Sequence, residues 1–346
     1  MRAVRTEIIE ADREGIERAA RLIRTGGIAA FPTETVYGLG ADAFDADAVQ
    51  RIFTAKGRPA DNPLIVHCAD FGMVRRVALE IPLAVERLSA EFWPGPLTVV
   101  LKKRPEIPAA VTAGLSTVAV RIPAHPAALA LIRAAGTPIA APSANSSGRP
   151  SPTAARHVYD DLNGKIPLIL DGGSCGVGVE STVLDLSGGE PVVLRQGGCP
   201  LERIEAALGQ KVKTIGRENG AGETGQSAPK SPGMKYRHYA PACEVRTFGG
   251  GNVSEILKAH ENCVQKNLKS AIITVEHRKN LYGDGRVLVL GRDAEEAARN
   301  LFRVFRDAER EYAVLLCEEL PEDGLGAAVN DRMRCAAAGN ELKNEN

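Results

Sequence analysis

The stretch Phe31-Pro-Thr-Glu-Thr-Val-Tyr-Gly-Leu-Gly40 decides how the first half of this chain folds. It continues a short apolar run, Ile28-Ala-Ala-Phe31, which is typical of a buried strand. It holds three hydroxyls, one carboxylate and two glycines. Thr33, Thr35 and Tyr37 alternate, and alternate side chains of an extended segment share a face. We therefore expect the hydroxyls to line one wall of a cleft; the alternative is a polar strand end with ordinary turn chemistry.

A second stretch, Lys56-Gly-Arg-Pro59, places two cations two residues apart, and Asn62 follows it. Arginine offers phosphates and carboxylates a planar fork, and lysine offers a point charge. Together with the nearby hydroxyls, the pair predicts a pocket for a small anionic ligand such as a nucleotide. The common phosphate loop G-x-x-x-x-G-K-[ST] does not occur in the sequence, so the cradle would be of another kind. The alternative is a solvated loop, since both residue types are usually exposed.

Composition and charge narrow the class of protein. The 346 residues exceed the usual size of one compact core, which predicts two domains. Equal numbers of basic and acidic residues, 43 each, predict at most a weak RNA contact. The sequence has neither an apolar run that could span a bilayer nor the apolar core of a signal peptide, so no membrane association is expected. Seven scattered cysteines without a C-x-x-C pair favour a cytoplasmic protein without disulfides or zinc.

Apolar and amphipathic runs alternate along the chain in two blocks. Residues 1–208 begin with an amphipathic helix capped by Asp12 and continue with short strands and helices. Between residues 168 and 194 the predicted strands are separated only by turns, which favours a mixed sheet. Residues 209–241 are rich in Gly, Lys, Ser and Thr and are interpreted as a linker. Residues 242–346 predict a smaller doubly wound α/β domain.

The elements of the first block can be placed individually from these patterns. The predicted strands are residues 28–31, 64–68, 97–101, 118–122, 138–141, 168–170, 182–186 and 192–194. The predicted helices are residues 12–25, 47–55, 83–92, 126–135 and 153–162.

Two titratable side chains interrupt apolar strands. Arg121 lies within Val118-Ala-Val-Arg-Ile122, where a charge costs stability unless an acid pairs with it. That acid is either an internal Asp or Glu or the carboxylate of a ligand. His67 lies near the end of Leu64-Ile-Val-His-Cys68. A histidine at such a position is more often a buried structural residue than a catalyst, and what it faces decides its role.

Ser143 and Asn145 follow another predicted strand, where they can offer a hydroxyl and an amide to phosphates or to a metal-bound water. Ligands of open α/β sheets bind at the carboxyl ends of the strands, which is where this loop should lie. The alternative is a Ser/Pro-rich loop that leads to an N-cap at Thr153.

The glycine-rich run at residues 172–182 precedes a strand and lacks the dinucleotide pattern G-x-G-x-x-G, so a dinucleotide site is rejected. A turn that brings Ser181 to a ligand stays open. Arg195 ends the next strand and adds another cation at a strand terminus. Such convergence of polar groups at successive strand ends is hard to explain by structural requirements alone.

The chain resembles the threonylcarbamoyl-AMP synthases of the longer, two-domain type, whose first domain has the YrdC-like fold, a twisted open mixed sheet with helices. The resemblance implies a Rossmann-like second domain. It rests on residues 30–241 and extends into the second domain at Ala298-Arg-Asn-Leu-Phe302 and Ala328-Val-Asn-Asp-Arg332. The matching stretches are Pro32-Thr-Glu-Thr-Val-Tyr-Gly-Leu-Gly40, Lys56-Gly-Arg-Pro59, Asn62-Pro-Leu-Ile-Val-His67, Trp93-Pro-Gly-Pro-Leu-Thr98, Val118-Ala-Val-Arg-Ile-Pro123, Ala141-Pro-Ser-Ala-Asn-Ser-Ser-Gly148, Val179-Glu-Ser-Thr182 and Ser231-Pro-Gly-Met-Lys-Tyr-Arg-His-Tyr-Ala-Pro241.

The resemblance implies an enzyme that makes L-threonylcarbamoyl-adenylate from L-threonine, bicarbonate and ATP, and releases pyrophosphate. ATP would be a substrate and would be accompanied by Mg²⁺. The product would pass to a tRNA threonylcarbamoyl transferase complex for the modification of adenosine 37 in tRNA.

The resemblance also implies a role for individual residues. L-threonine would be held by Thr35, His67, Arg121, the backbone of Ala141, and Ser181. ATP would be held by Lys56, Arg58, Asn62, Thr117, Ser143, Asn145, Ser151, Arg195 and Tyr236. Lys56 and Arg58 would also stabilise the charge that grows on the leaving pyrophosphate. The family often has Pro after the strand-end arginine, whereas this chain has Gln196, so the loop path near Arg195 stays open.

Two other functions fit part of the sequence. YrdC-like domains also occur in hydrogenase-maturation carbamoyltransferases, but those carry zinc-finger-like modules, and this chain has no C-x-x-C pair. A double-stranded RNA binder that uses a concave sheet face is the other alternative, and the zero net charge weakens it.

Overall fold

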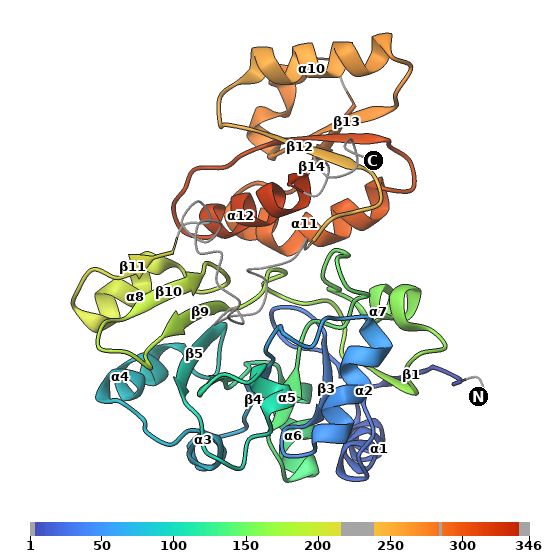
Figure 1. Cartoon of the computed structure of the whole chain (residues 1–346). Coiled ribbons are helices and arrows are strands. Elements are labelled where there is room, and N and C mark those ends of the chain that lie inside the picture. Colours follow the sequence, from blue (N-terminus) through green and yellow to red (C-terminus); the bar gives the residue numbers. More distant parts are fainter. Residues whose placement is uncertain (1–3, 216–238, 284–285, 339–346) are drawn as a thin grey trace. The chain divides into compact units, whose positions relative to one another are not determined.

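The computed structural model describes residues 4–215, 239–283 and 286–338 (Figure 1). The chain forms two compact units. The first comprises Met1–Ser147, Pro152–Gly176 and Glu180–Lys235, and the second comprises Gly148–Ser151, Val177–Val179 and Tyr236–Asn346. Residues 216–238 of the predicted linker, which include the predicted ATP residue Tyr236, lie outside the described residues.

Within the described residues the first unit is built on one sheet of eleven strands. They are β1 (Glu7–Glu10), β2 (Ala29–Phe31), β3 (Gly38–Asp42), β4 (Ile65–His67), β5 (Leu97–Lys102), β6 (Thr117–Arg121), β7 (Ile139–Ala141), β8 (Leu168–Asp171), β9 (Thr182–Asp185), β10 (Val192–Arg195) and β11 (Lys213–Thr214). Their order in space is β1-β8-β2-β3-β7-β4-β6-β5-β9-β10-β11. Neighbours such as β4 and β6 are parallel, whereas β5 and β6 are antiparallel, so the predicted mixed sheet is confirmed.

The described helices of this unit are α1 (Arg13–Arg24), α2 (Ala46–Lys56), α3 (Phe71–Val77), α4 (Leu83–Phe92), α5 (Ala109–Thr112), α6 (Pro126–Ala135), α7 (Ala155–Leu162) and α8 (Leu201–Leu208). Several of them begin at a polar cap, among them α1 at Asp12 and α2 at Asp45, and α2, α6 and α8 end at a glycine. The predicted cap is confirmed, since the amide of Gly15 donates to the Asp12 carboxylate at 2.8 Å. The predicted N-cap at Thr153 is wrong: α7 starts after Ala154, and the Thr153 amide donates to the ring of His157 instead.

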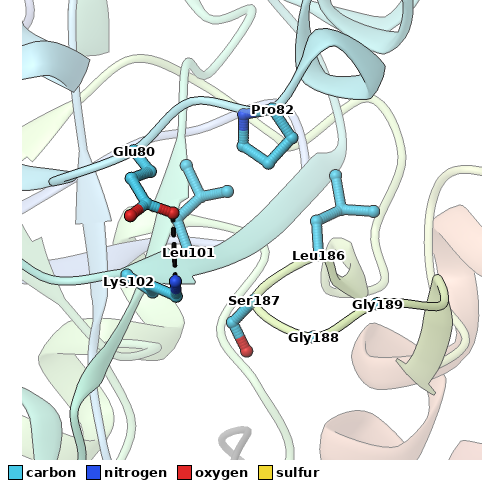
Figure 2. Close-up of a pocket in the computed structure, with 8 residues that line it drawn as sticks. All are labelled: Glu80, Pro82, Leu101, Lys102, Leu186, Ser187, Gly188 and Gly189. Carbon is cyan, nitrogen blue, oxygen red and sulfur yellow. Dashed lines mark hydrogen bonds and ion pairs between the residues drawn. The ribbon is translucent and has the colours of Figure 1, made fainter.

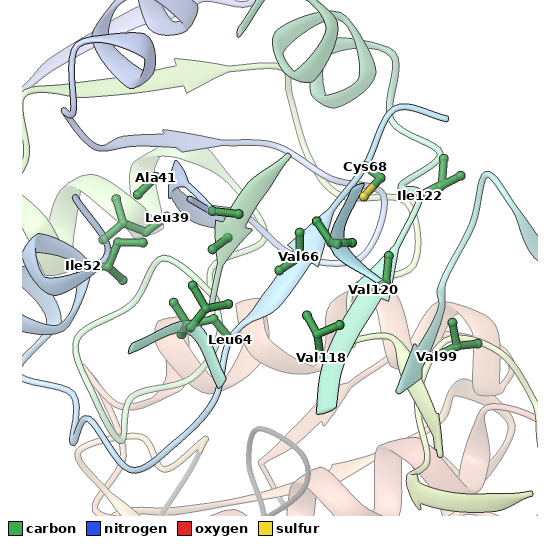
Figure 3. Packing of buried hydrophobic residues seen from close by; sticks show 14 of the residues in the cluster. Leu39, Ala41, Ile52, Leu64, Val66, Cys68, Val99, Val118, Val120 and Ile122 are labelled. Carbon is green, nitrogen blue, oxygen red and sulfur yellow. The ribbon is translucent and has the colours of Figure 1, made fainter. Parts of the chain in front are cut away.

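One side of the sheet carries the main core of the unit. Val66, Val118, Val120 and Val99 of β4, β6 and β5 pack there with side chains from α2, α4 and α7 (Figure 3). Because side chains of a strand alternate between faces, the residues between these valines must point to the opposite side.

The opposite side, which we call the α1 side, is covered by helices over only part of its width. α1 and α6 pack there against β2, β7 and β8. Further along the sheet a small apolar cluster is built from strand residues of β4, β5, β6, β9 and β10, with no described helix residue among its buried members: Ile65, Val100, Ala119, Val183 and Leu194. This part of the α1 side therefore has room for polar side chains beside an apolar floor.

The second unit contains a separate parallel sheet in the order β12-β15-β13-β14, formed by β12 (Glu244–Phe248), β13 (Ser270–Thr274), β14 (Val287–Val289) and β15 (Val314–Glu318). Its helical segments are α10 (Val253–Gln265), η1 (Glu276–Tyr282), α11 (Ala294–Ala308) and α12 (Gly326–Ala337). Figure 1 shows α10 on one face of this sheet and α11 with α12 on the other. The doubly wound α/β arrangement expected for this part of the chain is therefore confirmed.

Candidate active site

Strand register brings several predicted site residues into one row across the α1 side. His67 of β4 pairs with Arg121 of β6 on one flank and with Ile139 of β7 on the other. Val99 pairs with Val120, so the next step of the same register sets Thr98 opposite Arg121. Paired residues of neighbouring strands point to the same face. The row therefore combines an imidazole, a guanidinium and a hydroxyl at adjacent positions.

Arg121 is held from several sides although it is 97% buried, with an exposed fraction of 3%. Its Nη1 donates to the Thr35 hydroxyl at 2.8 Å, and its Nε donates to the Gly95 carbonyl at 3.0 Å. Its Nη2 lies 2.6 Å from a carboxylate oxygen of Glu34. The sequence required an acid for this arginine, and in the structure the acid is internal.

Thr35 reaches Arg121 from a turn rather than from an extended strand. The Thr33 hydroxyl donates to the Val36 carbonyl and accepts from the amides of Thr35 and Val36, which closes the turn. The hydroxyls of Thr33 and Thr35 lie 2.8 Å apart, whereas the Tyr37 hydroxyl donates away from them to the Gly173 carbonyl. The expectation of three hydroxyls on one extended wall is therefore wrong, because the Thr33 hydroxyl forms hydrogen bonds with the backbone of its own turn.

His67 is buried and stays uncharged at neutral pH. Burial, followed by the positive charge of Arg121, lowers its pKa to about 3. Its ring meets the edge of Phe31 at a centroid distance of 5.9 Å, and its Nδ1 has no hydrogen-bond partner among the described residues. A neutral imidazole with an unused nitrogen can accept or donate one hydrogen bond to a ligand.

Ser181 and Arg195 are in direct contact at the β9 end of the row. The Arg195 guanidinium donates to the Ser181 carbonyl at 2.9 Å and approaches its hydroxyl at 3.3 Å. The Ser181 hydroxyl also lies 2.8 Å from that of Thr98. After Arg195 the chain packs closely against the backbone of Glu180 and Ser181, since a Cβ atom at Gly197 would lie 2.3 Å from the Glu180 carbonyl oxygen. Gln196 is thus followed by an obligatory glycine.

Lys56 ties the end of α2 to the loop after β7. Its ammonium group donates to the backbone carbonyls of Ser143 and Asn145 and lies 3.4 Å from the Asn145 side-chain oxygen. The Ser143 hydroxyl donates to that same oxygen at 2.5 Å. The predicted polar loop is therefore a single hydrogen-bonded cluster around a lysine that is only 4% exposed.

Arg58, Asn62 and Thr117 lie toward the amino ends of β4 and β6, whereas His67 and Arg121 end these strands. The Arg58 guanidinium donates to the carbonyls of Asn62 and Pro63. Asn62 precedes β4, and Thr117 begins β6, which runs parallel to β4. Four steps of about 3.3 Å separate Thr117 from Arg121, or about 13 Å. The amide of Asn62 is buried without a hydrogen-bond partner among the described residues.

The remaining predicted site residues are distributed as follows. Ala141 ends β7 opposite Ile65, between the two polar ends of β4. Ser151 is buried, and its contacts group it with the second unit.

Sequence reasoning missed two contacts of this site. Thr98 ends the motif Trp93-Pro-Gly-Pro-Leu-Thr98 and was not predicted as a site residue, yet its hydroxyl lies 2.8 Å from that of Ser181. Glu34 was counted as the carboxylate of the first motif without being assigned to Arg121. The signal for Glu34 was present, because Arg121 required an acid and the hydroxyl-rich motif contained one.

A separate pocket lies elsewhere in the first unit. It measures about 330 Å³ and is lined by Glu80, Pro82, Leu101, Lys102, Leu186, Ser187, Gly188 and Gly189 (Figure 2). Lys102 and Leu186 mark the ends of β5 and β9 that are distant from Thr98 and Ser181. Its charged pair, Lys102 with Glu80, is more than half exposed on both sides. An exposed pair of this kind contributes little to binding, so the row around Arg121 is the stronger candidate.

Three further findings concern the whole described chain. None of the helices in the described part of the chain has the length and apolar character needed to span a bilayer. The described residues contain no group of three or more His, Cys, Asp and Glu side chains that could hold a metal ion. All seven cysteines are buried thiols that form no disulfide.

Comparison with protein families gives the class of protein to which this fold and site belong. Residues 21–197 match a family model described as telomere recombination. Residues 199–338 match a model described as the C-terminal domain of threonylcarbamoyl-AMP synthase. Together the two models cover nearly the whole chain.

Individual relatives sharpen this assignment. A threonylcarbamoyl-AMP synthase of Pyrococcus abyssi is 49% identical over 93% of this chain and 94% of its own length. One from Bacillus subtilis is 42% identical over 98% of this chain and 97% of its own length. The crystal structure of P. abyssi Sua5 complexed with L-threonine superposes with a TM-score of 0.88 at 47% identity and covers 97% of both chains. The chain belongs to the threonylcarbamoyl-AMP synthase family, in its two-domain form, and is an ATP-using enzyme.

Proposed function

We propose that the row around Arg121 binds L-threonine, and that the enzyme joins this amino acid to bicarbonate and to the AMP part of ATP there. The observation that carries the proposal is the environment of Arg121: a buried guanidinium that is fixed by the Thr35 hydroxyl and the Gly95 carbonyl and whose Nη2 faces a carboxylate, that of Glu34. A fixed, desolvated arginine is suited to a carboxylate. The relative whose structure contains L-threonine, 47% identical to this chain, supports the choice of amino acid.

The other groups of L-threonine find matching partners in the same row. Arg121 takes the carboxylate, and the hydroxyls of Thr35 and Ser181 lie beside it. Neutral His67 offers its unused Nδ1 to the threonine hydroxyl. The backbone at Ala141 closes the site from the neighbouring strand.

ATP occupies the polar groups beside this row. Arg58, Asn62 and Thr117 form one contact region, and Ser143, Asn145, Ser151, Arg195 and Tyr236 complete the proposed set. The contact between Arg195 and Ser181 supports a meeting point of the amino acid and the α-phosphate. Lys56 keeps the Ser143–Asn145 loop in shape, and with Arg58 it brings positive charge toward the phosphates.

Mg²⁺ fits this site as a companion of ATP. The described residues hold no acidic or histidine cluster that could bind a metal by themselves, and Mg²⁺ in nucleotide sites takes much of its coordination from phosphates and water. Ser143 and Asn145 supply the neutral oxygen atoms that would complete its shell. Bound there, Mg²⁺ neutralises triphosphate charge.

The chemistry needs positioning and charge neutralisation more than a covalent nucleophile. The amine of threonine, once deprotonated, forms a carbamate with bicarbonate and releases water. An oxygen of the carbamate then attacks the α-phosphorus of ATP, and the bond to pyrophosphate breaks. The cations Lys56 and Arg58 stabilise the negative charge that moves onto the leaving pyrophosphate.

The wider setting follows from the same proposal. The catalytic domain spans residues 1–208, the linker spans residues 209–241, and the C-terminal domain spans residues 242–346.

The product passes to a tRNA threonylcarbamoyl transferase complex for modification of adenosine 37, which requires at most weak RNA contact by this enzyme. The seven cysteines form no disulfide among the described residues, which supports the proposal of a reducing, cytoplasmic location.

Pyrophosphate release from ATP tests the proposal. We expect release by the purified chain to require both L-threonine and bicarbonate, and to stop when either is omitted. Carbamoyl phosphate should not replace bicarbonate and ATP. Release that continues at the same rate without threonine would refute the proposed reaction.

A further inference from the structure

Glu34 has no role in the site as proposed so far, yet it lies in its centre. Its carboxylate approaches the Arg121 guanidinium at 2.6 Å, and its side chain is only 15% exposed. The two residues are far apart in sequence, and Glu34 reaches Arg121 from the same Thr33–Val36 turn that carries Thr35. A largely buried acid at the point where a ligand carboxylate should bind needs an explanation, because the two negative charges would repel each other.

The contact between Glu34 and Arg121 is close but incomplete. The two charged atoms meet the distance of an ion pair, yet they lack the geometry of a hydrogen bond. Both carboxylate oxygens of Glu34 and Nη2 of Arg121 therefore have no hydrogen-bond partner among the described residues. The ion pair offsets only part of the solvation that the two charges lose, because it adds no hydrogen bond between them. Glu34 and Arg121 can therefore each exchange the other for a charged ligand group that also makes a hydrogen bond.

The two charges of the site are complementary to the two charges of a zwitterionic amino acid. Glu34 contributes one negative charge and Arg121 one positive charge, while His67 is neutral because burial keeps its pKa near 3. A zwitterionic amino acid brings one carboxylate for the guanidinium and one ammonium for the carboxylate. A plain hydroxy acid would satisfy Arg121 only by displacing Glu34 and leaving it without a cation.

We propose that Glu34 binds the ammonium group of the amino-acid substrate, and that the substrate takes apart the Glu34–Arg121 ion pair by giving each partner a new counter-ion. This inference rests on the assignment of the row around Arg121 to L-threonine. It adds a specificity: the site selects amino acids over hydroxy acids of the same shape. A ligand with a carboxylate alone has to compete with Glu34, whereas the zwitterion compensates both buried charges.

Binding measured by calorimetry in EDTA, without ATP or Mg²⁺, tests this role. The two ligands are L-threonine and (R)-3-hydroxybutanoate, which is threonine without its amine. The variant is Glu34→Gln, which keeps the shape of the side chain and removes its charge. The control is Glu318→Gln, since Glu318 is a carboxylate 1% exposed that is paired with Arg278 in the second unit.

The two ligands should respond in opposite directions. Glu34→Gln should weaken L-threonine about tenfold or more, the usual effect of losing one charge-assisted hydrogen bond. The same change should strengthen (R)-3-hydroxybutanoate, because Arg121 no longer has a competing carboxylate. The Glu318→Gln control should leave both affinities unchanged. Should Glu34→Gln fail to fold, Glu34→Asp withdraws the carboxylate and should produce the same pair of opposite changes at smaller size.

A purely structural role for Glu34 predicts something else. If Glu34 merely held Arg121 in place, both ligands would weaken together, and that result would overturn the proposal. An unchanged ratio of the two affinities would overturn it as well. Failure of the wild-type chain to bind L-threonine at all is a separate outcome, since it removes the assignment of the site itself.

Discussion

Arg121 is the residue on which the amino-acid site depends, because its guanidinium contacts Thr35, Gly95 and Glu34 at once. Arg121→Lys keeps a positive charge near Glu34 but loses the planar fork. We expect the KM for L-threonine to rise about tenfold while the KM for ATP stays within about twofold. The exposed Arg87→Lys serves as the control. Steady-state kinetics with each substrate varied in turn measure both constants, and equal increases would speak against a carboxylate role for Arg121.

His67 links the stability of the fold to pH. In the folded chain burial lowers its pKa to about 3, against an ordinary value of 6.5. Between these values the unfolded chain binds a proton that the folded chain does not, so stability falls as the pH drops below 6.5. At pH 5 the loss from this one group is about 2 kcal/mol.

Urea unfolding of wild type and His67→Asn at pH 7.5 and pH 5 measures this effect. The wild-type chain should lose about 2 kcal/mol more than the variant on going to pH 5. The exposed His277→Asn is the matched control and should lose as much as the wild type. The same pH-dependent loss in wild type and His67→Asn would show that His67 is not the group responsible.

At the residue scale the sequence revealed types of contact better than their geometry. It showed that Arg121 needed an acid, but a strand residue gives no clue to which distant turn supplies it. It grouped Thr33, Thr35 and Tyr37 by alternation, whereas the Thr33 hydroxyl closes a turn and so redirects the chain. Hydrogen bonds between a side chain and its own backbone override a simple period-two pattern.

Among the elements, long amphipathic or apolar runs were predicted well and glycine-rich ones were not. The helices at 83–92 and 126–135 have the expected bounds in α4 and α6. β3 was missed because Gly38-Leu-Gly-Ala-Asp42 has weak strand propensity. It is a strand because β2 and β7 pair with it on both sides, a non-local effect that local sequence does not encode.

The substitution Gly40→Ala tests why β3 has a glycine at this position. A Cβ atom there would lie 2.5 Å from Cγ2 of Ile139 and 2.8 Å from Cε1 of Phe31. Gly40→Ala should therefore lower the free energy of unfolding by about 1–3 kcal/mol through overpacking. Gly188→Ala is the control, since a Cβ atom at Gly188 meets nothing within 4 Å. Urea midpoints provide the comparison, and equal stability of the two variants would contradict the packing account.

For the molecule as a whole, the alternation of strands and helices predicted the fold class, and the resemblance of motifs predicted the family. Strand order could not be read from the sequence, because β8 pairs with β1 and β2 across most of the first unit. That order creates the site: it sets β4, β6, β5 and β9 side by side so that His67, Arg121, Thr98 and Ser181 share one face. The predicted linker contact of Tyr236 lies outside the described residues and stays a prediction.

The central claim is that one site joins L-threonine, bicarbonate and ATP, and isotope incorporation tests it most directly. The purified chain is incubated with ATP, Mg²⁺, L-threonine and ¹³C-bicarbonate. The adenylates are separated at once, and their masses are measured by mass spectrometry. The account predicts an adenylate that contains threonine and is heavier by the one labelled carbon. It also predicts that the Arg121→Lys variant needs more threonine to form it. An adenylate without the label, or AMP alone, would contradict the account.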